Sequence, residues 1–284
     1  MIKAAVCGYG NMGKNHVRVF KKIKNVKLEY VYDPKIKNGI SYQEFVNNCK
    51  DLDVVSICCP SDKHADTALD LLRTNPNIKL LIEKPVDLNI EAAKRLYDYA
   101  DNIVVGHIER FNPAITKLKE MINNNELGQI YSISTKRMGP TPSRELNDVA
   151  VDLLVHDIDV VNYLLEQQPV KTYIRKLSTK SNDVYDYSSI SAKYGDIDCR
   201  FEANWVCPKK IRKMDILCEE GLLYVDYINQ KITKYNVNGS SQEIEVKYSE
   251  PLLNELEHLI SFASGAASPK ISLKDAISVL EMVK

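Results

Sequence analysis

A glycine-rich run near the N-terminus has the spacing of a dinucleotide-binding loop. The run is Gly8-Tyr9-Gly10-Asn11-Met12-Gly13, a GxGxxG pattern between an apolar stretch and a helical one, which is the context that dinucleotide binding requires. The first glycine permits a tight turn, the second lets the backbone approach a pyrophosphate, and the third lets helix and strand pack closely. The N–H groups at the start of the helix then face the phosphates.

Asp33 lies 20 residues beyond Gly13, at the end of the next apolar stretch. A carboxylate in this position accepts hydrogen bonds from both ribose hydroxyls and repels a 2′-phosphate. The sequence therefore predicts NAD as the cofactor and disfavours NADP, although the nearby Lys35 weakens that repulsion. The alternative is a glycine turn that only closes a strand–helix corner, with Asp33 as a solvated strand-end residue.

Two further segments follow apolar stretches, on the sheet edge where open parallel sheets bind ligands. In Glu83-Lys84-Pro85 the proline keeps the chain extended, which could direct the Lys84 ammonium group towards a ligand. Otherwise Lys84 is a surface residue at a strand end. His64, close after Pro60, could contact the cofactor or simply lie in the first turn of a helix. We expect Pro60, His64 and Glu83 among the cofactor contacts.

Three ionisable residues share one stripe of a predicted helix: Asp152, His156 and Asp159, spaced i, i+4 and i+7. Their neighbours are mostly apolar, so the helix is expected to be buried, where carboxylates are costly unless they are paired or used. We therefore expect the stripe to face a polar cavity. A histidine there can accept a proton from an alcohol, and Asp152 can orient it. The alternative is an Asp–His pair that only links the helix.

The segment from Gly106 to Pro113 also follows an apolar stretch and contains Arg110 and Asn112. These two side chains could hold a substrate phosphate or substrate hydroxyls. Equally, Arg110 could pair with the adjacent Glu109 and have no role in binding.

The first part of the chain alternates short β-branched runs with amphipathic stretches, which predicts parallel strands joined by covering helices. Ser41, Ser61 and Asn89 are the expected N-caps. The predicted strands are residues 2–7, 26–32, 52–58, 78–82 and 102–106, and the predicted helices are residues 11–23, 41–49, 61–74 and 89–100.

Beyond about residue 125 one long predicted helix, about 147–166, precedes strands without helices between them. Hairpin turns are expected at Gly195, Gly221 and Asn238-Gly239, and Ser272 is the expected cap of the last helix. The predicted strands are 170–178, 184–194, 197–206, 210–218, 221–227, 230–237 and 242–248, and the closing helices are about 252–264 and 273–283.

These elements predict an α/β protein of two domains, as expected for 284 residues. Residues 1–117 form a dinucleotide-binding Rossmann domain with a doubly wound parallel sheet. Residues 118–284 form an α+β domain for substrate binding and oligomerisation, with a mostly antiparallel open sheet. Because this sheet has helices for one face only, we expect an apolar face that a second subunit could cover.

The charge balance and the cysteine pattern exclude several classes of protein. The 38 basic residues balance the 38 acidic ones, so no positive field indicates a nucleic-acid partner. The longest run without Asp, Glu, Lys or Arg, residues 258–269, is shorter than the ~20 residues of a membrane span, and no secretory signal is expected. Seven cysteines without a CxxC pair predict no disulfides and no metal site, and indicate buried thiols in a reducing cytoplasm.

The glycine run, Glu83-Lys84-Pro85 and the Asp152-x-x-x-His156 motif, in this order and at these separations, resemble the Gfo/Idh/MocA family over nearly the whole chain. In that family the lysine of the E-K-P motif and the aspartate and histidine of the D-x-x-x-H motif form the catalytic group. The resemblance therefore implies that Lys84, Asp152 and His156 are catalytic. It also implies a homodimer or homotetramer.

Residues 105–114, the run Val155-His156-Asp157-Ile158-Asp159 and Lys210-Ile211-Arg212 after Trp205 are similar to one branch of that family, the UDP-N-acetylglucosamine 3-dehydrogenases. The resemblance implies a NAD-dependent oxidoreductase acting on a nucleotide sugar, with the sugar 3-hydroxyl oxidised to a ketone. The implied substrate contacts are Arg110, Asn112, Asp159, Lys210 and Arg212, of which the basic ones suit a diphosphate. The alternatives are a dehydrogenase of a free sugar or inositol, and a catalytically silent NAD-binding sensor or assembly protein.

Overall fold

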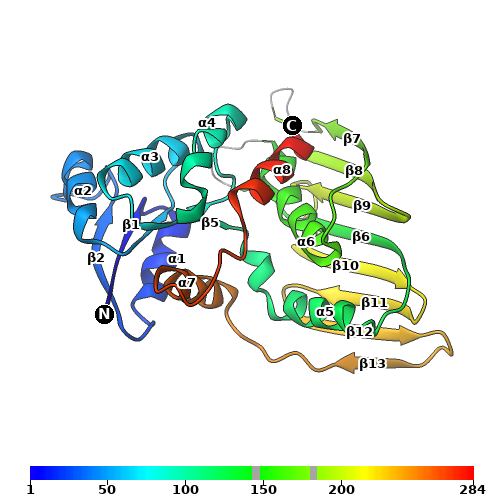
Figure 1. Cartoon of the computed structure of the whole chain (residues 1–284). Coiled ribbons are helices and arrows are strands. Elements are labelled where there is room, and N and C mark those ends of the chain that lie inside the picture. Colours follow the sequence, from blue (N-terminus) through cyan, green and yellow to red (C-terminus); the bar gives the residue numbers. More distant parts are fainter. Residues whose placement is uncertain (143–147, 180–183) are drawn as a thin grey trace. The chain divides into compact units, whose positions relative to one another are not determined.

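The computed structural model describes residues 1–142, 148–179 and 184–284 and divides the chain into two compact units (Figure 1). The first unit comprises Met1–Ile108 and Glu250–Glu281, and the second comprises Glu109–Ser249 and Met282–Lys284. The sequence places the boundary at residue 117 and both closing helices in the second domain. In the structure helix α7 (Pro251–Ala263) belongs to the first unit because its buried leucines pack into that unit's core.

The first unit is built on a five-stranded parallel sheet of order β2-β1-β3-β4-β5, which confirms the predicted Rossmann architecture. Helices α1 and α7 contact each other, whereas α2, α3 and α4 form a separate layer (Figure 1). The strands are β1 (Ile2–Cys7), β2 (Val26–Tyr32), β3 (Val54–Ile57), β4 (Lys79–Glu83) and β5 (Ile103–Gly106). The helices are α1 (Asn11–Phe20), α2 (Tyr42–Asn48), α3 (His64–Thr74), α4 (Ile90–Lys94), α7 and α8 (Leu273–Val283), with short turns η1 (Cys49–Asp51), η2 (Ser61–Lys63) and η3 (Tyr97–Asn102).

Local sequence signals explain where several of these helices begin. Ser41 accepts a hydrogen bond from the Glu44 N–H and Asn89 accepts one from the Glu91 N–H, so both predicted N-caps are confirmed. The Ser272 hydroxyl likewise accepts from the Asp275 N–H ahead of α8. The prediction for Ser61 is wrong, because the chain first makes the 3₁₀ turn η2 and α3 begins only at His64.

The second unit contains an eight-stranded sheet of order β13-β12-β11-β10-β6-β9-β8-β7. Strands β6 and β9 run parallel and the other described pairs are antiparallel, which confirms a mostly antiparallel sheet. The strands are β6 (Ile130–Met138), β7 (Lys171–Leu177), β8 (Tyr187–Tyr194), β9 (Ile197–Asn204), β10 (Ile211–Cys218), β11 (Gly221–Asp226), β12 (Lys231–Asn236) and β13 (Ser241–Ile244). The helical elements are η4 (Ile108–Phe111), α5 (Pro113–Asn123), η5 (Ala150–Leu154) and α6 (Val155–Leu165).

The helix α5 and the strand β6 of this unit, together with the short turn η4, are absent from the sequence-based prediction. The helix has a clear start signal, since Asn112 caps it by accepting from the Ala114 N–H and Pro113 occupies its first turn. The strand alternates buried and half-buried residues and lies in the middle of the sheet, between β10 and β9. The sequence-based prediction missed this central strand because it contains the polar residues Ser, Thr, Lys and Arg.

One face of the second sheet is covered by α5 and α6 (Figure 1). Arg137 of β6 pairs with Asp157 of α6, so the buried residues of β6 that share its parity, Ile133 and Thr135, face the helices. The opposite face carries Ser132, Ser134, Lys136, Lys213 and Asp215 on the central strands. It is therefore of mixed polarity, and the expectation of an apolar face is wrong for these strands. Among the described residues, no helix combines the length and the apolar composition needed to cross a membrane.

Candidate functional site

The glycine loop between β1 and α1 has a separate steric reason for each glycine. Gly8 has φ +99°, and a Cβ on it would lie 2.5 Å from the Cys59 backbone nitrogen. A Cβ on Gly13 would lie 1.9 Å from the Gly8 carbonyl oxygen, so helix and strand pack too closely for any side chain. A Cβ on Gly10 would meet no atom within 4 Å. The open side of the loop is therefore at Gly10, where the pyrophosphate of a dinucleotide would approach.

The start of α1 is suited to an anion. Gly10 occupies the N-cap position without a capping side chain, so the first N–H groups of the helix are not satisfied by a cap. Tyr9, Asn11 and Met12 are exposed around this point. These features fit the phosphates of a bound dinucleotide.

Asp33 lies next to the loop, as the ribose-binding prediction requires. One of its carboxylate oxygens accepts a hydrogen bond of 2.7 Å from the Tyr9 N–H, and the other accepts one of 2.8 Å from the Lys35 N–H. The side chain is half-buried, so the two backbone contacts fix its orientation and leave part of the carboxylate accessible. A ribose held by Asp33 would lie beside the glycine loop.

His64 is the first residue of α3 and is 1% exposed. Its Nδ1 lies 2.8 Å from the Pro85 carbonyl oxygen and its Nε2 lies 2.9 Å from the Cys59 carbonyl oxygen. Carbonyl oxygens only accept hydrogen bonds, so a doubly protonated ring is required to donate to both. His64 thus links the segments that follow β3 and β4, while Pro60 is exposed just before η2.

Cys59, which the sequence analysis treats as one of several buried thiols, has a lowered pKa in the structure. The Cys7 thiol donates a hydrogen bond to Cys59, and this bond, against the effect of burial and together with the charge of His64, lowers the pKa of Cys59 to about 6. Such a pKa favours the thiolate at neutral pH. The Cys59 backbone itself packs against Gly8. The sequence signal that could have indicated a cysteine near the ligand edge is the position of Cys58 and Cys59 directly after the buried strand β3.

Glu83, at the end of β4, is 7% exposed and lies 3.0 Å from Nε2 of the buried His16. Burial by itself would raise the pKa of Glu83, but the hydrogen bond and the charge of His16 outweigh this effect and lower the pKa. Its second oxygen accepts a hydrogen bond of 3.3 Å from the Lys84 N–H. Glu83 therefore holds the backbone from which the Lys84 side chain extends.

In the second unit the predicted stripe of Asp152, His156 and Asp159 lies partly at half-buried and partly at fully buried positions. The continuous predicted helix is interrupted by the π-helical turn η5, which contains Asp152, while His156 and Asp159 lie on α6; the predicted first residue, 147, is outside the described residues. Asp152 and His156 are both half-buried, whereas Asp159 is 0% exposed. Turns of π-helix occur frequently at functional sites. The structure thus keeps Asp152 and His156 accessible and buries Asp159.

Asp159 forms a two-bond ion pair with Arg110 inside the second unit. The Arg110 Nε and Nη2 atoms lie 2.8 and 2.7 Å from the two carboxylate oxygens, and Arg110 is 5% exposed. Asn112 is also committed to the fold, because its amide caps α5 and donates a 3.0 Å hydrogen bond to the Tyr227 carbonyl oxygen. Three of the five predicted substrate contacts, Arg110, Asn112 and Asp159, therefore have buried partners of their own.

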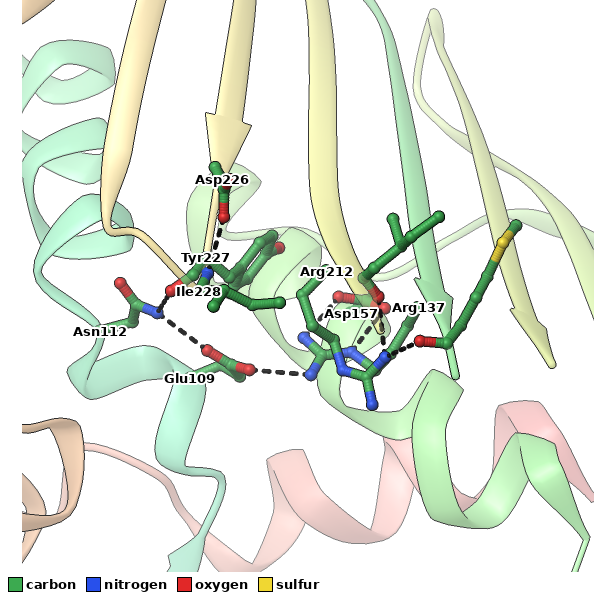
Figure 2. A network of polar contacts seen from close by, with 10 residues as sticks. Glu109, Asn112, Arg137, Asp157, Arg212, Asp226, Tyr227 and Ile228 are labelled. Atoms are coloured by element: carbon green, nitrogen blue, oxygen red, sulfur yellow. Dashed lines mark hydrogen bonds and ion pairs between the residues drawn. The ribbon is translucent and has the colours of Figure 1, made fainter. Parts of the chain in front are cut away.

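A second buried ion pair, which the sequence analysis did not foresee, joins β6 to α6 (Figure 2). Arg137 makes two hydrogen bonds of 2.9 Å to Asp157 and one of 2.8 Å to Glu109. Its guanidinium also lies over the Tyr227 ring, 5.3 Å from the centroid. The partners are 20 and 28 residues away along the chain, so no local spacing signals the pairing.

Arg212 lies beside this network but does not share its carboxylates. Its Nη1 donates to two backbone carbonyl oxygens, at 2.5 Å to Met138 and 2.7 Å to Ile211 (Figure 2). Burial, reinforced by the charge of Arg137, lowers the pKa of Arg212 to about 10. The guanidinium still carries its charge at neutral pH, and these two hydrogen bonds go to neutral carbonyl oxygens while the carboxylates of Asp157, Glu109 and Asp152 act on it through charge alone. Lys210, just before β10, is exposed.

Known proteins match both units of this chain. Residues 2–105 match the model of an oxidoreductase family with a NAD-binding Rossmann fold, and residues 115–224 match the GFO/IDH/MocA C-terminal domain. An inositol 2-dehydrogenase of Rhizobium meliloti is 24% identical over 67% of this chain and 64% of its own length, so the match spans less than two thirds of that relative. The UDP-N-acetylglucosamine 3-dehydrogenase of Acidithiobacillus ferrooxidans is 24% identical over 83% of this chain and 77% of its own length.

A solved structure of the same Acidithiobacillus ferrooxidans enzyme, GnnA, has a TM-score of 0.87 to this chain. The superposition covers 99% of this chain and 95% of that structure at 22% sequence identity. This similarity shows a shared fold across both units.

The buried pair of Arg110 and Asp159 should contribute strongly to stability. Asp159→Asn leaves the Arg110 guanidinium buried without its counter-charge, and we expect the free energy of unfolding in urea to fall by about 3–5 kcal/mol. The double variant Arg110→Met, Asp159→Leu should recover most of this loss. The exposed Asp198→Asn on β9 is the control and should change stability by less than about 0.5 kcal/mol. A loss as small as the control's in Asp159→Asn would contradict the assignment.

The thiolate character of Cys59 can be measured by alkylation. Iodoacetamide should modify Cys59 with a rate that rises through a midpoint near pH 6, because only the thiolate reacts. In Cys7→Ala the hydrogen bond is lost, so the midpoint should move to higher pH. Peptide mass spectrometry identifies the labelled residue. A midpoint in the alkaline range for the wild-type protein would show that Cys59 is an ordinary thiol.

Proposed function

This chain belongs to the GFO/IDH/MocA family of oxidoreductases, and on that premise we propose that it is a NAD-dependent dehydrogenase of a nucleotide sugar. The proposed substrate is UDP-N-acetylglucosamine, oxidised at its 3-hydroxyl. The two curated relatives described above act on an inositol and on this nucleotide sugar, both of which carry secondary hydroxyls.

The observation that carries the proposal is the geometry of the glycine loop with Asp33. Gly8 and Gly13 are required by packing, and Gly10 alone of the three opens to unfilled space at the start of α1. Asp33 is fixed by the Tyr9 N–H beside that opening, and its negative charge favours a free ribose 2′-hydroxyl over a 2′-phosphate. This charge supports NAD rather than NADP as the proposed cofactor. We propose that Gly8, Gly10, Gly13 and Asp33 hold the dinucleotide, with Tyr9, Asn11, Met12, Pro60 and His64 around it.

Bound NAD supplies the hydride acceptor. We propose that His156 accepts the proton of the substrate hydroxyl, since an imidazole titrates near neutral pH. The Lys84 ammonium stabilises the negative charge that develops on the same oxygen, and Asp152 orients His156. Glu83 positions the Lys84 backbone, as its 3.3 Å contact with the Lys84 N–H supports.

A charged substrate is supported by Arg212. Among the described residues this half-buried guanidinium donates hydrogen bonds to backbone carbonyl oxygens, and a diphosphate could add a directly bonded negative charge to those of the nearby carboxylates. We propose Arg212 and the exposed Lys210 as the diphosphate contacts. Arg110, Asn112 and Asp159 then support the site from inside the second unit rather than through direct contact with substrate.

The second candidate is a dehydrogenase of free inositol or of a free sugar. It is favoured by the inositol 2-dehydrogenase relative, whose identity to this chain, 24%, equals that of the nucleotide-sugar enzyme. An uncharged polyol would offer Arg212 no phosphate to bind. A silent NAD-binding protein is a weaker alternative because Lys84, Asp152 and His156 are all present. The cytoplasmic location and the homo-oligomeric state stay predictions.

The substrate is tested by mixing the protein with NAD and a panel of UDP-sugars, free sugars and inositol, and recording NADH absorbance. We expect turnover with UDP-N-acetylglucosamine. Arg212→Met should raise KM for that substrate about 10-fold or more, because one charge-assisted contact is lost. Inositol turnover without any nucleotide-sugar turnover would establish the second candidate.

In the same assay Lys84→Ala should lower kcat by about 10²-fold or more, since it removes stabilisation of the developing charge. Lys50→Ala, at an exposed position in η1, is the matched control and should leave kcat unchanged. Full turnover by Lys84→Ala would remove the lysine from the mechanism.

A further inference from the structure

Three ionisable side chains meet in the interior of the first unit, outside the glycine loop. They are His16 of α1, Glu83 at the end of β4 and Glu255 of α7, and their exposed fractions are 0%, 7% and 0%. One nitrogen or oxygen of each residue lies within 4.8 Å of the corresponding atoms of the other two. The proposed reaction uses neither His16 nor Glu255.

Glu255 is the exceptional member of this cluster. Neither of its carboxylate oxygens accepts a hydrogen bond from any residue that the structure describes, and the same is true of Nδ1 of His16. Buried carboxyl groups in proteins are almost always hydrogen-bonded or neutralised by a partner. The Glu255 carboxylate therefore faces Glu83 and His16 without any contact that compensates its burial.

Two kinds of positive charge could compensate it: a proton on Glu255 or a cation between the three residues. Burial and then the charge of Glu83 raise the pKa of Glu255 well above its usual range. An ionised Glu255 therefore requires a positive charge beside it. A proton on Glu255 would be expected to point at an acceptor within hydrogen-bond distance, and no such acceptor is found among the described residues. The separation is instead close to that of ligands around one ion. Nitrogen and oxygen ligands lie about 2.0–2.2 Å from Zn²⁺, so two ligands of a tetrahedral ion are about 3.5 Å apart, and the ligand atoms here are at most 4.8 Å apart.

We propose that His16, Glu83 and Glu255 bind one divalent cation of the Zn²⁺ class. The charge of the ion equals that of the two carboxylates, so the buried cluster becomes neutral as a whole. A histidine nitrogen among the ligands favours Zn²⁺ and its first-row neighbours over Mg²⁺ and Ca²⁺, which prefer oxygen ligands alone. Three protein ligands leave one position of a tetrahedral ion for water.

The ion would have a structural role. Its ligands come from α1, β4 and α7, which are far apart in the sequence, and α7 returns to the first unit only after the whole second unit. A shared ion would tie that returning helix to the sheet and to the helix that follows the glycine loop. The sequence analysis predicts no metal because it relies on cysteine spacing, and these ligands have no local spacing pattern.

The first test is the metal content of the protein as purified without a metal-affinity tag and dialysed against chelating resin. Mass spectrometry of the elements should find about one divalent first-row ion per chain. Glu255→Gln keeps the shape of the side chain and removes its charge, so the content should fall about 10-fold or more. Glu257→Gln, an exposed position on the same helix, is the matched control and should keep the ion.

The second test uses the wild-type protein alone, so it stays decisive even if Glu255→Gln does not fold. After chelation, added Zn²⁺ should raise Tm, and added Co²⁺ should produce visible absorption bands that Zn²⁺ abolishes by competition. A metal-free wild-type protein with no Tm response and no Co²⁺ bands would overturn the proposal and indicate that Glu255 is protonated. Neither readout depends on turnover, so the proposed dehydrogenase activity stands or falls separately.

Discussion

The contact between Gly8 and Gly13 is the constraint on which the first unit depends. Because a Cβ at Gly13 would lie 1.9 Å from the Gly8 carbonyl oxygen, the start of α1 can pack against the end of β1 only when position 13 lacks a side chain. That closeness brings the N-terminus of the helix to the sheet edge, next to Asp33 on the neighbouring strand's end and Cys59 beyond β3. The start of α1, the Asp33 carboxylate and the Cys59 thiol are thereby gathered in one place by backbone packing.

In the second unit the organising interaction is the pairing of buried charges. Asp157 and Asp159 are neighbours on α6, yet each is matched by its own arginine, Arg137 from β6 and Arg110 from η4. Breaking a buried pair is costly because it leaves one charge uncompensated, so these pairs fix the helix relative to the sheet. Asp152 and His156 lie outside both pairs at half-buried positions. The same helix thus carries structural carboxylates and, in our proposal, the catalytic group.

Much of the frame follows from local patterns in the sequence. The apolar run of β3 and the capping residues Ser41 and Asn89 are local signals, and the strands of the first sheet lie close to their predicted positions. The prediction missed β6 because charged residues such as Lys136 and Arg137 are typical of exposed segments. Only the structure shows that Arg137 is buried against its partner Asp157. Arg110 and Asp159 are 49 residues apart in the chain. Only the tertiary structure shows that they pair with each other and are not exposed charges that could contact a substrate directly. The lowered pKa of Cys59 depends in the same way on Cys7 from another strand.

The central claim is that a dinucleotide binds at the open side of the glycine loop, and Gly10 provides the most direct measurement. Gly10 has ordinary extended backbone angles and no atom within 4 Å of a Cβ, so Gly10→Val should fold with an unchanged Tm. Calorimetric titration should show one NAD bound per wild-type chain and an affinity about 10-fold weaker or worse in Gly10→Val, because the valine fills the space of the pyrophosphate. Equal NAD affinity in the two proteins, or no NAD binding by the wild-type chain, would contradict the account.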